Sequence, residues 1–238
     1  MLRVNRLIAT TLIAVCMIFS FTSVTAFAYY QDSEASITHS GNKVTFKGKT
    51  WTDAYRTLVS HIETQLYVYN YLTNTVFYDV YGTDSGKDQL ILSRIGTLAK
   101  VWYCNSVHGV VKYVGDSTPY LTKDTVKWNN SSNSNANNAV LEEKVIAGHH
   151  AASDEILRCF GYTPEDYSFY WNEELDSILP EQFLQIHRQL GLKAGDMCPG
   201  YYLDEPSNTL IAVNKNQHGE NQLFLFYKNP DGMFVLKR

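Results

Sequence analysis

The stretch spanning residues 139–160 has the clearest periodicity in the chain and constrains the fold most strongly. Apolar and small residues recur in it every three or four positions, which is the spacing of one face of an α-helix. The predicted core stripe consists of Leu141, Val145, Gly148, Ala152, Ile156 and Cys159. Gly148 and Ala152 are four residues apart, so a neighbouring backbone is expected to approach the helix closely there.

The opposite side of this helix carries three titratable side chains, Glu143, His150 and Asp154. His150 and Asp154 are four residues apart, so their side chains meet on a helix. An imidazole with carboxylates is a ligand set for zinc or another divalent metal, and these three residues are therefore a candidate metal site. The alternative is an ordinary His–Asp pair on a solvated face. Glu143 lies about 10 Å from His150 along the axis, so another segment would have to supply a ligand to a shared ion.

Residues 1–28 have the three parts of a secretory signal peptide. Arg3 and Arg6 precede a long apolar run, and Ala26 and Ala28 form a small-x-small cleavage site. We expect export and cleavage after Ala28, which leaves a secreted chain without a membrane span. The alternative is an uncleaved N-terminal anchor, because the apolar run is long enough to cross a bilayer.

Charge and composition narrow the range of partners. Without Arg3 and Arg6 the chain has 18 basic residues against 24 acidic ones, a net charge of −6. An acidic protein without a cluster of lysine and arginine is not expected to bind nucleic acid. The 45% apolar content is sufficient for a core, so we expect a folded protein with a glycan or protein ligand outside the cytoplasm.

Three cysteines follow the signal segment: Cys104, Cys159 and Cys198. In an oxidising compartment two of them can pair and one is left over. Cys159 lies on the predicted core stripe of its helix, and Cys198 lies in a loop that could reach it. The expected disulfide is therefore Cys159–Cys198.

The same cysteines offer two weaker catalytic sites. Cys104 and His108 are four residues apart and could act as nucleophile and base, although a position near a helix C-terminus does not activate a thiol. Cys198 and His218, with Asp231, follow the chain order of a papain- or transglutaminase-like triad. However, Cys198 does not open a helix and His218 lies in a turn. Whether the protein is an enzyme is left undecided by these patterns.

The chain divides at an Asn/Ser-rich segment. Residues 129–138 are polar and uncharged, and they are expected to be a linker or exposed loop between a mixed helical region, 29–128, and a second region, 139–238. Within 43–47 an alternating pattern predicts a strand. The predicted helices span residues 52–72, 88–105, 139–160, 163–179 and 180–190.

The last third of the chain has a different periodicity. Apolar runs at 209–214, 222–228 and 233–237 are separated by turn sequences, which predicts a three-stranded antiparallel meander. The fold class predicted from the whole pattern is α+β, with about five α-helices followed by this C-terminal β-meander.

Tyrosine is abundant, with 17 residues that all follow the signal segment. Exposed aromatic residues stack on sugars or anchor protein contacts, although tyrosines also fill the edges of cores. The candidate ligand-binding residues are Tyr67, Tyr69, Tyr71, Tyr170, Trp171, Tyr201 and Tyr202. The leading interpretation is a secreted, tyrosine-rich binding module for glycan, cell-envelope or protein ligands. The alternatives are an extracytoplasmic hydrolase, using a metal at His150 and Asp154 or a cysteine, and an interaction factor without a defined ligand.

The export prediction has a direct test. Mass spectrometry of the protein recovered outside the cytoplasm should show a chain that begins at Tyr29, because the small-x-small site ends at Ala28. An intact N-terminus recovered in the membrane fraction would instead support the uncleaved anchor.

Overall fold

The computed structural model describes residues 29–97, 102–129, 138–204 and 206–237. The predicted signal peptide and most of the predicted linker lie outside these ranges. Residues Gln31–Arg238 form one compact unit. Within the described ranges, no helix combines the length and the apolar character needed to cross a membrane.

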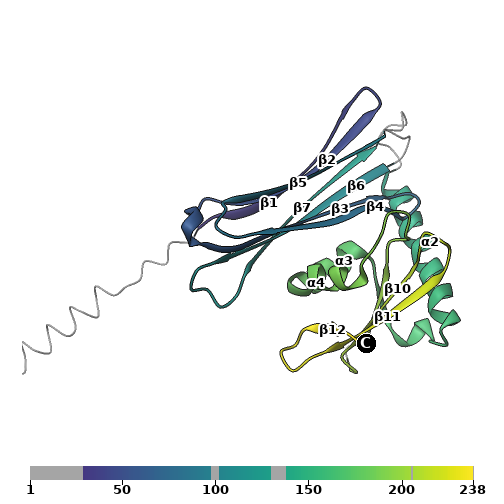
Figure 1. Ribbon diagram of the computed structural model, residues 1–238. Coiled ribbons are helices and arrows are strands. Elements are labelled where there is room, and N and C mark those ends of the chain that lie inside the picture. Colours follow the sequence, from purple (N-terminus) through teal and green to yellow (C-terminus); the bar gives the residue numbers. More distant parts are fainter. Residues whose placement is uncertain (1–28, 98–101, 130–137, 205, 238) are drawn as a thin grey trace, which may run out of the picture. The chain divides into compact units, whose positions relative to one another are not determined.

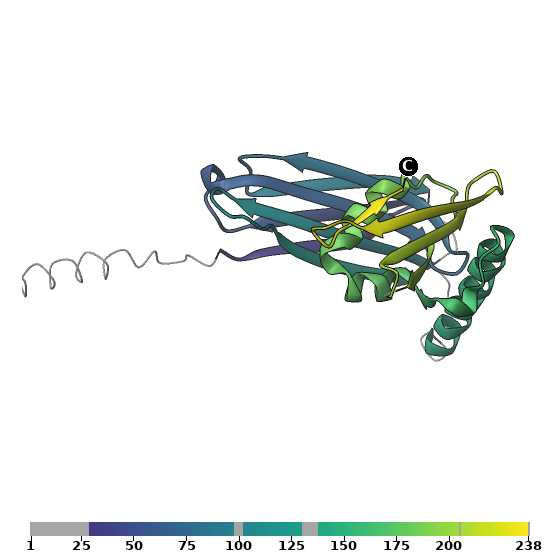
Figure 2. The same cartoon turned by 90° about the horizontal axis from the view of Figure 1, so that it is seen from below.

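The first half of the unit is a sandwich of two antiparallel sheets (Figures 1 and 2). Sheet 1 has the order β1-β2-β5 and sheet 2 the order β4-β3-β6-β7. Their strands are β1 (Gln31–Ser40), β2 (Lys43–Thr52), β3 (Val59–Asn70), β4 (Thr75–Asp84), β5 (Gln89–Thr97), β6 (Trp102–Tyr113) and β7 (Tyr120–Asn129), with a 3-10 turn at Arg56–Leu58. The inner faces meet through Val44, Phe46, Leu66, Val68, Tyr103 and Val107.

The second half builds sheet 3, which has the antiparallel order β12-β11-β10-β9-β8. Its elements are α2 (Asn138–Cys159), a 3-10 turn at Pro164–Asp166, β8 (Ser168–Tyr170), α3 (Asn172–Ile178), α4 (Pro180–Leu190), β9 (Gly200–Asp204), β10 (Thr209–Lys215), β11 (Asn221–Lys228) and β12 (Phe234–Leu236). Helix α2 packs on this sheet through Ile156 and Leu157. Helices α3 and α4 lie between sheet 3 and the sandwich (Figure 1).

The predicted α+β class is wrong. The described residues form 12 strands in three antiparallel sheets and only three α-helices, so the protein is mostly β. The helices predicted at 52–72 and 88–105 are replaced by β3, β5 and β6. Strand β3 is buried on both faces from Ile62 to Asn70, so it lacks the alternation of a half-buried strand. Its apolar residues matched a helical stripe, but its β-branched and aromatic side chains suit a sheet.

Other predicted elements are present. The helix predicted at 180–190 is α4, and the helix predicted at 139–160 is α2. The strand predicted at 43–47 lies within β2. The three C-terminal strands are β10, β11 and β12, but β8 and β9 extend their sheet to five strands. The helix predicted at 163–179 is limited to α3, because the chain first forms strand β8 at Ser168–Tyr170.

The buried face of α2 differs from the predicted stripe. His149 and Ser153 are buried together with Ile156, whereas Gly148 and Cys159 are exposed. The two ring nitrogens of His149 hydrogen-bond Asn74 Nδ2 and, at 3.3 Å, the carbonyl oxygen of Pro199. Burial lowers the His149 pKa to about 3, so the ring is neutral near pH 7. These two hydrogen bonds hold the His149 side of α2 against Asn74 and Pro199, and the predicted apolar stripe does not include this polar contact.

The close backbone approach expected at Gly148 occurs at Gly200 instead. A Cβ added at Gly148 would meet no atom within 4 Å. A Cβ added at Gly200 would lie 2.7 Å from Ser153 Cβ and 3.0 Å from Phe169 Cε2. Strand β9 therefore needs glycine in order to lie against α2.

Two glycine-to-alanine variants test this packing. Gly148→Ala should raise the free energy of unfolding by about 1 kcal/mol, because alanine is the better helix former and the site is open. Gly200→Ala should lower it by about 1–3 kcal/mol through steric overlap with Ser153 and Phe169. Urea unfolding of both variants measures the difference, and equal effects would show that α2 is not seated on β9 in this way.

Candidate functional site

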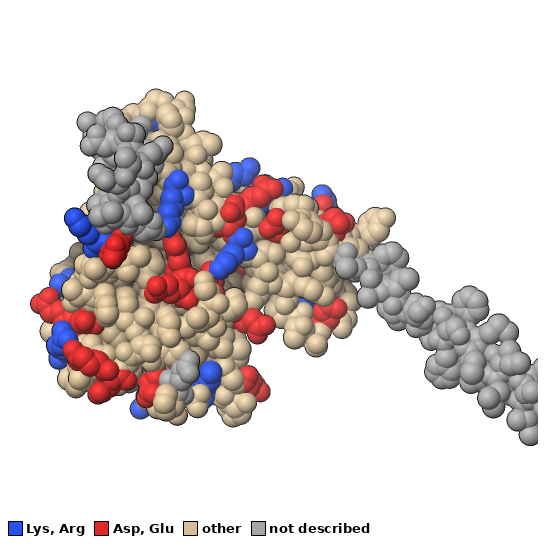
Figure 3. Space-filling view, turned by 180° about the vertical axis from the view of Figure 1, so that it is seen from behind, with Lys and Arg blue, Asp and Glu red and all other residues tan. Residues whose placement is uncertain are grey.

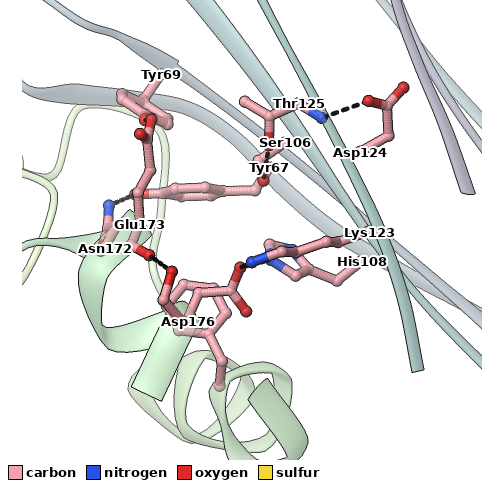
Figure 4. Close-up of a pocket in the computed structure, with 12 residues that line it drawn as sticks. Tyr67, Tyr69, Ser106, His108, Lys123, Asp124, Thr125, Asn172, Glu173 and Asp176 are labelled. Atoms are coloured by element: carbon pink, nitrogen blue, oxygen red, sulfur yellow. Dashed lines mark hydrogen bonds and ion pairs between the residues drawn. The ribbon is translucent and has the colours of Figure 1, made fainter. Parts of the chain in front are cut away.

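A cleft of about 360 Å³ opens between sheet 2 and helix α3 (Figure 4). This volume lies within the range of small-molecule binding sites, roughly 300–1,000 Å³. Its walls are formed by Tyr67, Tyr69, Ser106, His108, Lys123, Asp124, Thr125, Asn172, Glu173, Asp176, Ser177 and Phe183. The cleft thus combines residues from β3, β6 and β7 with residues from α3 and α4.

Strand alternation presents the polar wall of the cleft. Lys123 and Thr125 are two residues apart on β7 and therefore point to the same face of sheet 2. In the register of β6 and β7, Lys123 lies opposite His108 and Thr125 lies opposite Ser106. Ser106 Oγ and Thr125 Oγ1 are 3.1 Å apart and hydrogen-bonded. Two rows of polar side chains consequently run across this face.

Helix α3 supplies the opposite wall. The helix begins after Trp171, whose backbone N–H donates to Glu174 Oε2 at 3.0 Å, and this contact fixes the helix start. Glu173 and Asp176 are three residues apart, so they lie on the same side of the helix. They face sheet 2 across the cleft (Figure 4).

Two ion pairs connect the walls. Lys123 Nζ lies 2.8 Å from Asp176 Oδ2, and Lys127 Nζ lies 3.1 Å from Glu173 Oε1. His108 Nε2 lies 3.4 Å from the same Asp176 oxygen, without the alignment of a hydrogen bond. Burial opposes ionisation of Asp176, but His108 and Lys123 together hold its pKa below the ordinary value. Asp176 is therefore a charged anchor that joins α3 to sheet 2.

His108 has a protected environment. Both ring nitrogens are inaccessible to water, and the ring packs on Phe183 with a centroid distance of 4.9 Å. Phe183 in turn packs on His187, whose Nε2 shares a 2.7 Å hydrogen bond with the Tyr201 hydroxyl. Burial lowers the His187 pKa to about 3. His108 and Phe183 thus line the cleft, and the fully buried rings of His187 and Tyr201 lie behind Phe183 in the core.

The tyrosines predicted to bind ligand are mainly core residues. The C-terminal half of the chain packs against the outer face of sheet 2, and this packing buries the aromatic residues of both halves. The fully or nearly fully buried members are Tyr67, Tyr69, Tyr71, Trp171, Tyr201 and Tyr202, whereas Tyr170 is half-buried. Only Tyr67 and Tyr69 reach the cleft, and they form its floor. Exposed stacking surfaces are not found at these seven positions.

The floor is held by hydrogen bonds to α3. Asn172 Nδ2 donates to the Tyr67 hydroxyl at 3.3 Å, and the Tyr69 hydroxyl donates to Glu173 Oε1 at 3.4 Å. Each tyrosine therefore fixes one side chain of the opposite wall. Both contacts connect residues more than 100 positions apart in the chain.

A partly buried carboxyl group lies beside this floor. Asp79 is opposite Tyr67 in the β3–β4 register. Its Oδ1 accepts from Gln65 Nε2 at 2.7 Å, and its Oδ2 accepts from the Tyr81 hydroxyl at 3.2 Å. Burial raises the Asp79 pKa to about 7, and the two hydrogen bonds only partly offset this effect.

The candidate metal site is only partly assembled. His150 Nε2 and Asp154 Oδ1 are 3.4 Å apart, as the helical spacing predicted. The His150 ring stacks on Phe169, and Asp154 Oδ1 accepts a 2.7 Å hydrogen bond from Tyr202. Glu143 is exposed, and the described part of the chain contains no group of three or more His, Cys, Asp or Glu residues placed to hold a metal. The contacts of this pair are those of an ordinary His–Asp pair.

The cysteine predictions are not supported by the arrangement. Cys159 is exposed at the end of α2 and Cys198 is completely buried, and the structure does not join them. Burial raises the pKa of the Cys198 thiol, which disfavours a nucleophilic role, and His218 is exposed in a turn. Cys104 and His108 lie on a strand, where four residues span about 13 Å instead of one helical turn.

The sequence was compared with protein-family models and with curated proteins. No protein-family model matches the sequence, and no curated protein is significantly similar to it.

The Asp79 environment predicts a specific pH dependence. The folded-state pKa of about 7 exceeds the ordinary value of 3.8, so the folded protein retains a proton that the unfolded chain releases. The retained proton stabilises the folded state fully below about pH 4. Between about pH 4 and pH 7 its contribution to the free energy of unfolding falls by about 1.4 kcal/mol per pH unit. Asp79→Asn cannot lose this proton, so its unfolding free energy relative to the parent should increase over the same window.

Urea unfolding from pH 4.5 to 7.5 measures this difference. Asp84→Asn is a matched control on the same strand, because Asp84 is held ionised by Lys87 and its pKa is lowered. Its stability relative to the parent should be flat above pH 5. If the unfolding free energy of Asp79→Asn relative to the parent is also independent of pH, the protonated Asp79 carboxyl group is contradicted.

Proposed function

We propose that this protein is an extracytoplasmic binding protein for a small glycan fragment of the cell envelope, held in the cleft between sheet 2 and α3. The observation that carries the proposal is the convergence of donors and acceptors on one cavity of ligand size. Sugars present many hydroxyl groups that both donate and accept hydrogen bonds, so a lining of both kinds suits them.

The accessible groups of the cleft fit an uncharged ligand. The side chains of Lys123 and Glu173 are 51% and 44% exposed, so both can reach a ligand. Each is already paired with an opposite charge across the cleft. Hydrogen-bonding capacity remains, because a lysine ammonium group has three donors and a carboxylate has several acceptor positions.

The surface charge agrees with this ligand class. Acidic and basic side chains are interspersed on the face shown in Figure 3, without a broad basic area. The acidic balance of the whole sequence, −4, also disfavours nucleic acid as the partner. A neutral glycan does not require a surface of one charge.

The geometry disfavours hydrolysis by a histidine, a cysteine or a metal. A general base must reach the reacting group within hydrogen-bond distance, but both ring nitrogens of His108 are inaccessible to water. Cys198 is buried, and the described residues contain no metal-ligand cluster. These observations disfavour a hydrolase that uses His108, Cys198 or a metal at this site, whereas the carboxylates of Glu173 and Asp176 remain in the cleft lining.

Filling the cleft tests the proposal. Thr125→Trp should abolish the binding of N-acetylglucosamine oligosaccharides, measured by isothermal titration calorimetry, because the indole would occupy the cavity from its β7 wall. Thr38→Trp is the matched control, since Thr38 is an exposed strand threonine in sheet 1. Absence of binding in the parent, or equal affinities in both variants, would contradict a glycan site in this cleft.

A further inference from the structure

A second cavity of about 160 Å³ adjoins the cleft. The two cavities share three wall residues, His108, Lys123 and Asp176. The remaining lining of the second cavity is formed by Gly109, Leu121, Thr122, Pro180 and Leu184. This lining is mainly aliphatic, in contrast to the polar lining of the cleft.

Both walls change from polar to apolar in the same direction. On β7 the same-face residues run from Thr125 through Lys123 to Leu121. On the helical side the lining runs from Glu173 through Asp176 in α3 to the aliphatic start of α4. The Lys123–Asp176 ion pair lies at the boundary on both walls. Two independent segments thus define one continuous groove with a polar end and an apolar end.

The volume of the apolar end limits the size of the group that it can hold. A cavity of about 150 Å³ lined by aliphatic and aromatic side chains can hold a benzene molecule. The second cavity can therefore accept a group of about six carbon atoms. Leu184 is 9% exposed and Leu121 is 36% exposed, so the cavity has a closed side and an open mouth.

We infer that the ligand is an acylated sugar whose acyl chain, of up to about six carbons, occupies the second cavity. This inference rests on the proposed glycan site and specifies its ligand class. The sugar hydroxyls meet the polar cleft, and the acyl carbonyl lies beside Lys123. Lys123 Nζ makes one contact with Asp176 and has further donors for that carbonyl oxygen.

Two sugars that differ only in chain length test the inference. Calorimetry should show that N-hexanoylglucosamine binds the parent protein tenfold to a hundredfold more tightly than N-acetylglucosamine, because four added methylene groups leave water. Equal affinities would overturn the acyl site and leave the proposed glycan site intact. Binding of neither sugar would contradict the glycan site and this inference with it.

Two variants test whether the acyl chain lies in the second cavity. Leu121→Asp places a charge at the mouth of the second cavity and should bring the affinity ratio of the two sugars close to one. Ile95→Asp is the matched control, because Ile95 is 63% exposed on β5 of sheet 1, and it should retain the parent ratio. A chain-length preference that survives in Leu121→Asp would place the acyl group elsewhere and overturn the inference.

Discussion

Burial of strand β3 on both faces is the constraint on which the rest of the structure depends. Its inward residues, such as Leu66 and Val68, pack against sheet 1, while its outward residues Tyr67 and Tyr69 join the core formed with α3, α4 and sheet 3. A sandwich alone would expose these tyrosines to water. The C-terminal half covers them, and Asp176 of α3 is held over sheet 2 by ion pairing. The cleft is the part of this covered face that remains open.

The fold was predictable where local signals decide the structure. Pro180 opens α4, and Gly191 ends it in the left-handed conformation, with φ of 61°. Turn residues likewise delimit β10 and β11. The helix predicted in place of strand β3 is wrong because burial on both faces removes the two-residue alternation of a half-buried strand. The burial of its outer face comes from α3, α4 and sheet 3, which are distant in sequence, so no local pattern reports it.

The site was less predictable than the fold. The sequence predicts His108 as a candidate residue, but with Cys104 as its partner, because residues 88–105 match a helical pattern. Its real neighbour, Asp176, is on α3, and the two residues meet only after β6 and α3 are packed together. One local signal was available: residues 121–128 alternate between the outer and inner faces of β7, which places Lys123 on the outer face. The strand or extended structure that the sequence predicts for residues 109–128 is consistent with that polar row, but nothing in this segment reports the helix opposite it.

We propose that one cleft, formed by β6, β7 and α3, binds the ligand. Amide chemical-shift mapping by NMR, with N-acetylglucosamine oligosaccharides added to the whole protein, tests it most directly. We expect concerted shifts at Ser106, Thr125 and Glu173, which line the cleft from three separate elements, and unchanged amide positions on β1. Shifts confined to α2 near His150, or no shifts at any residue, would contradict it.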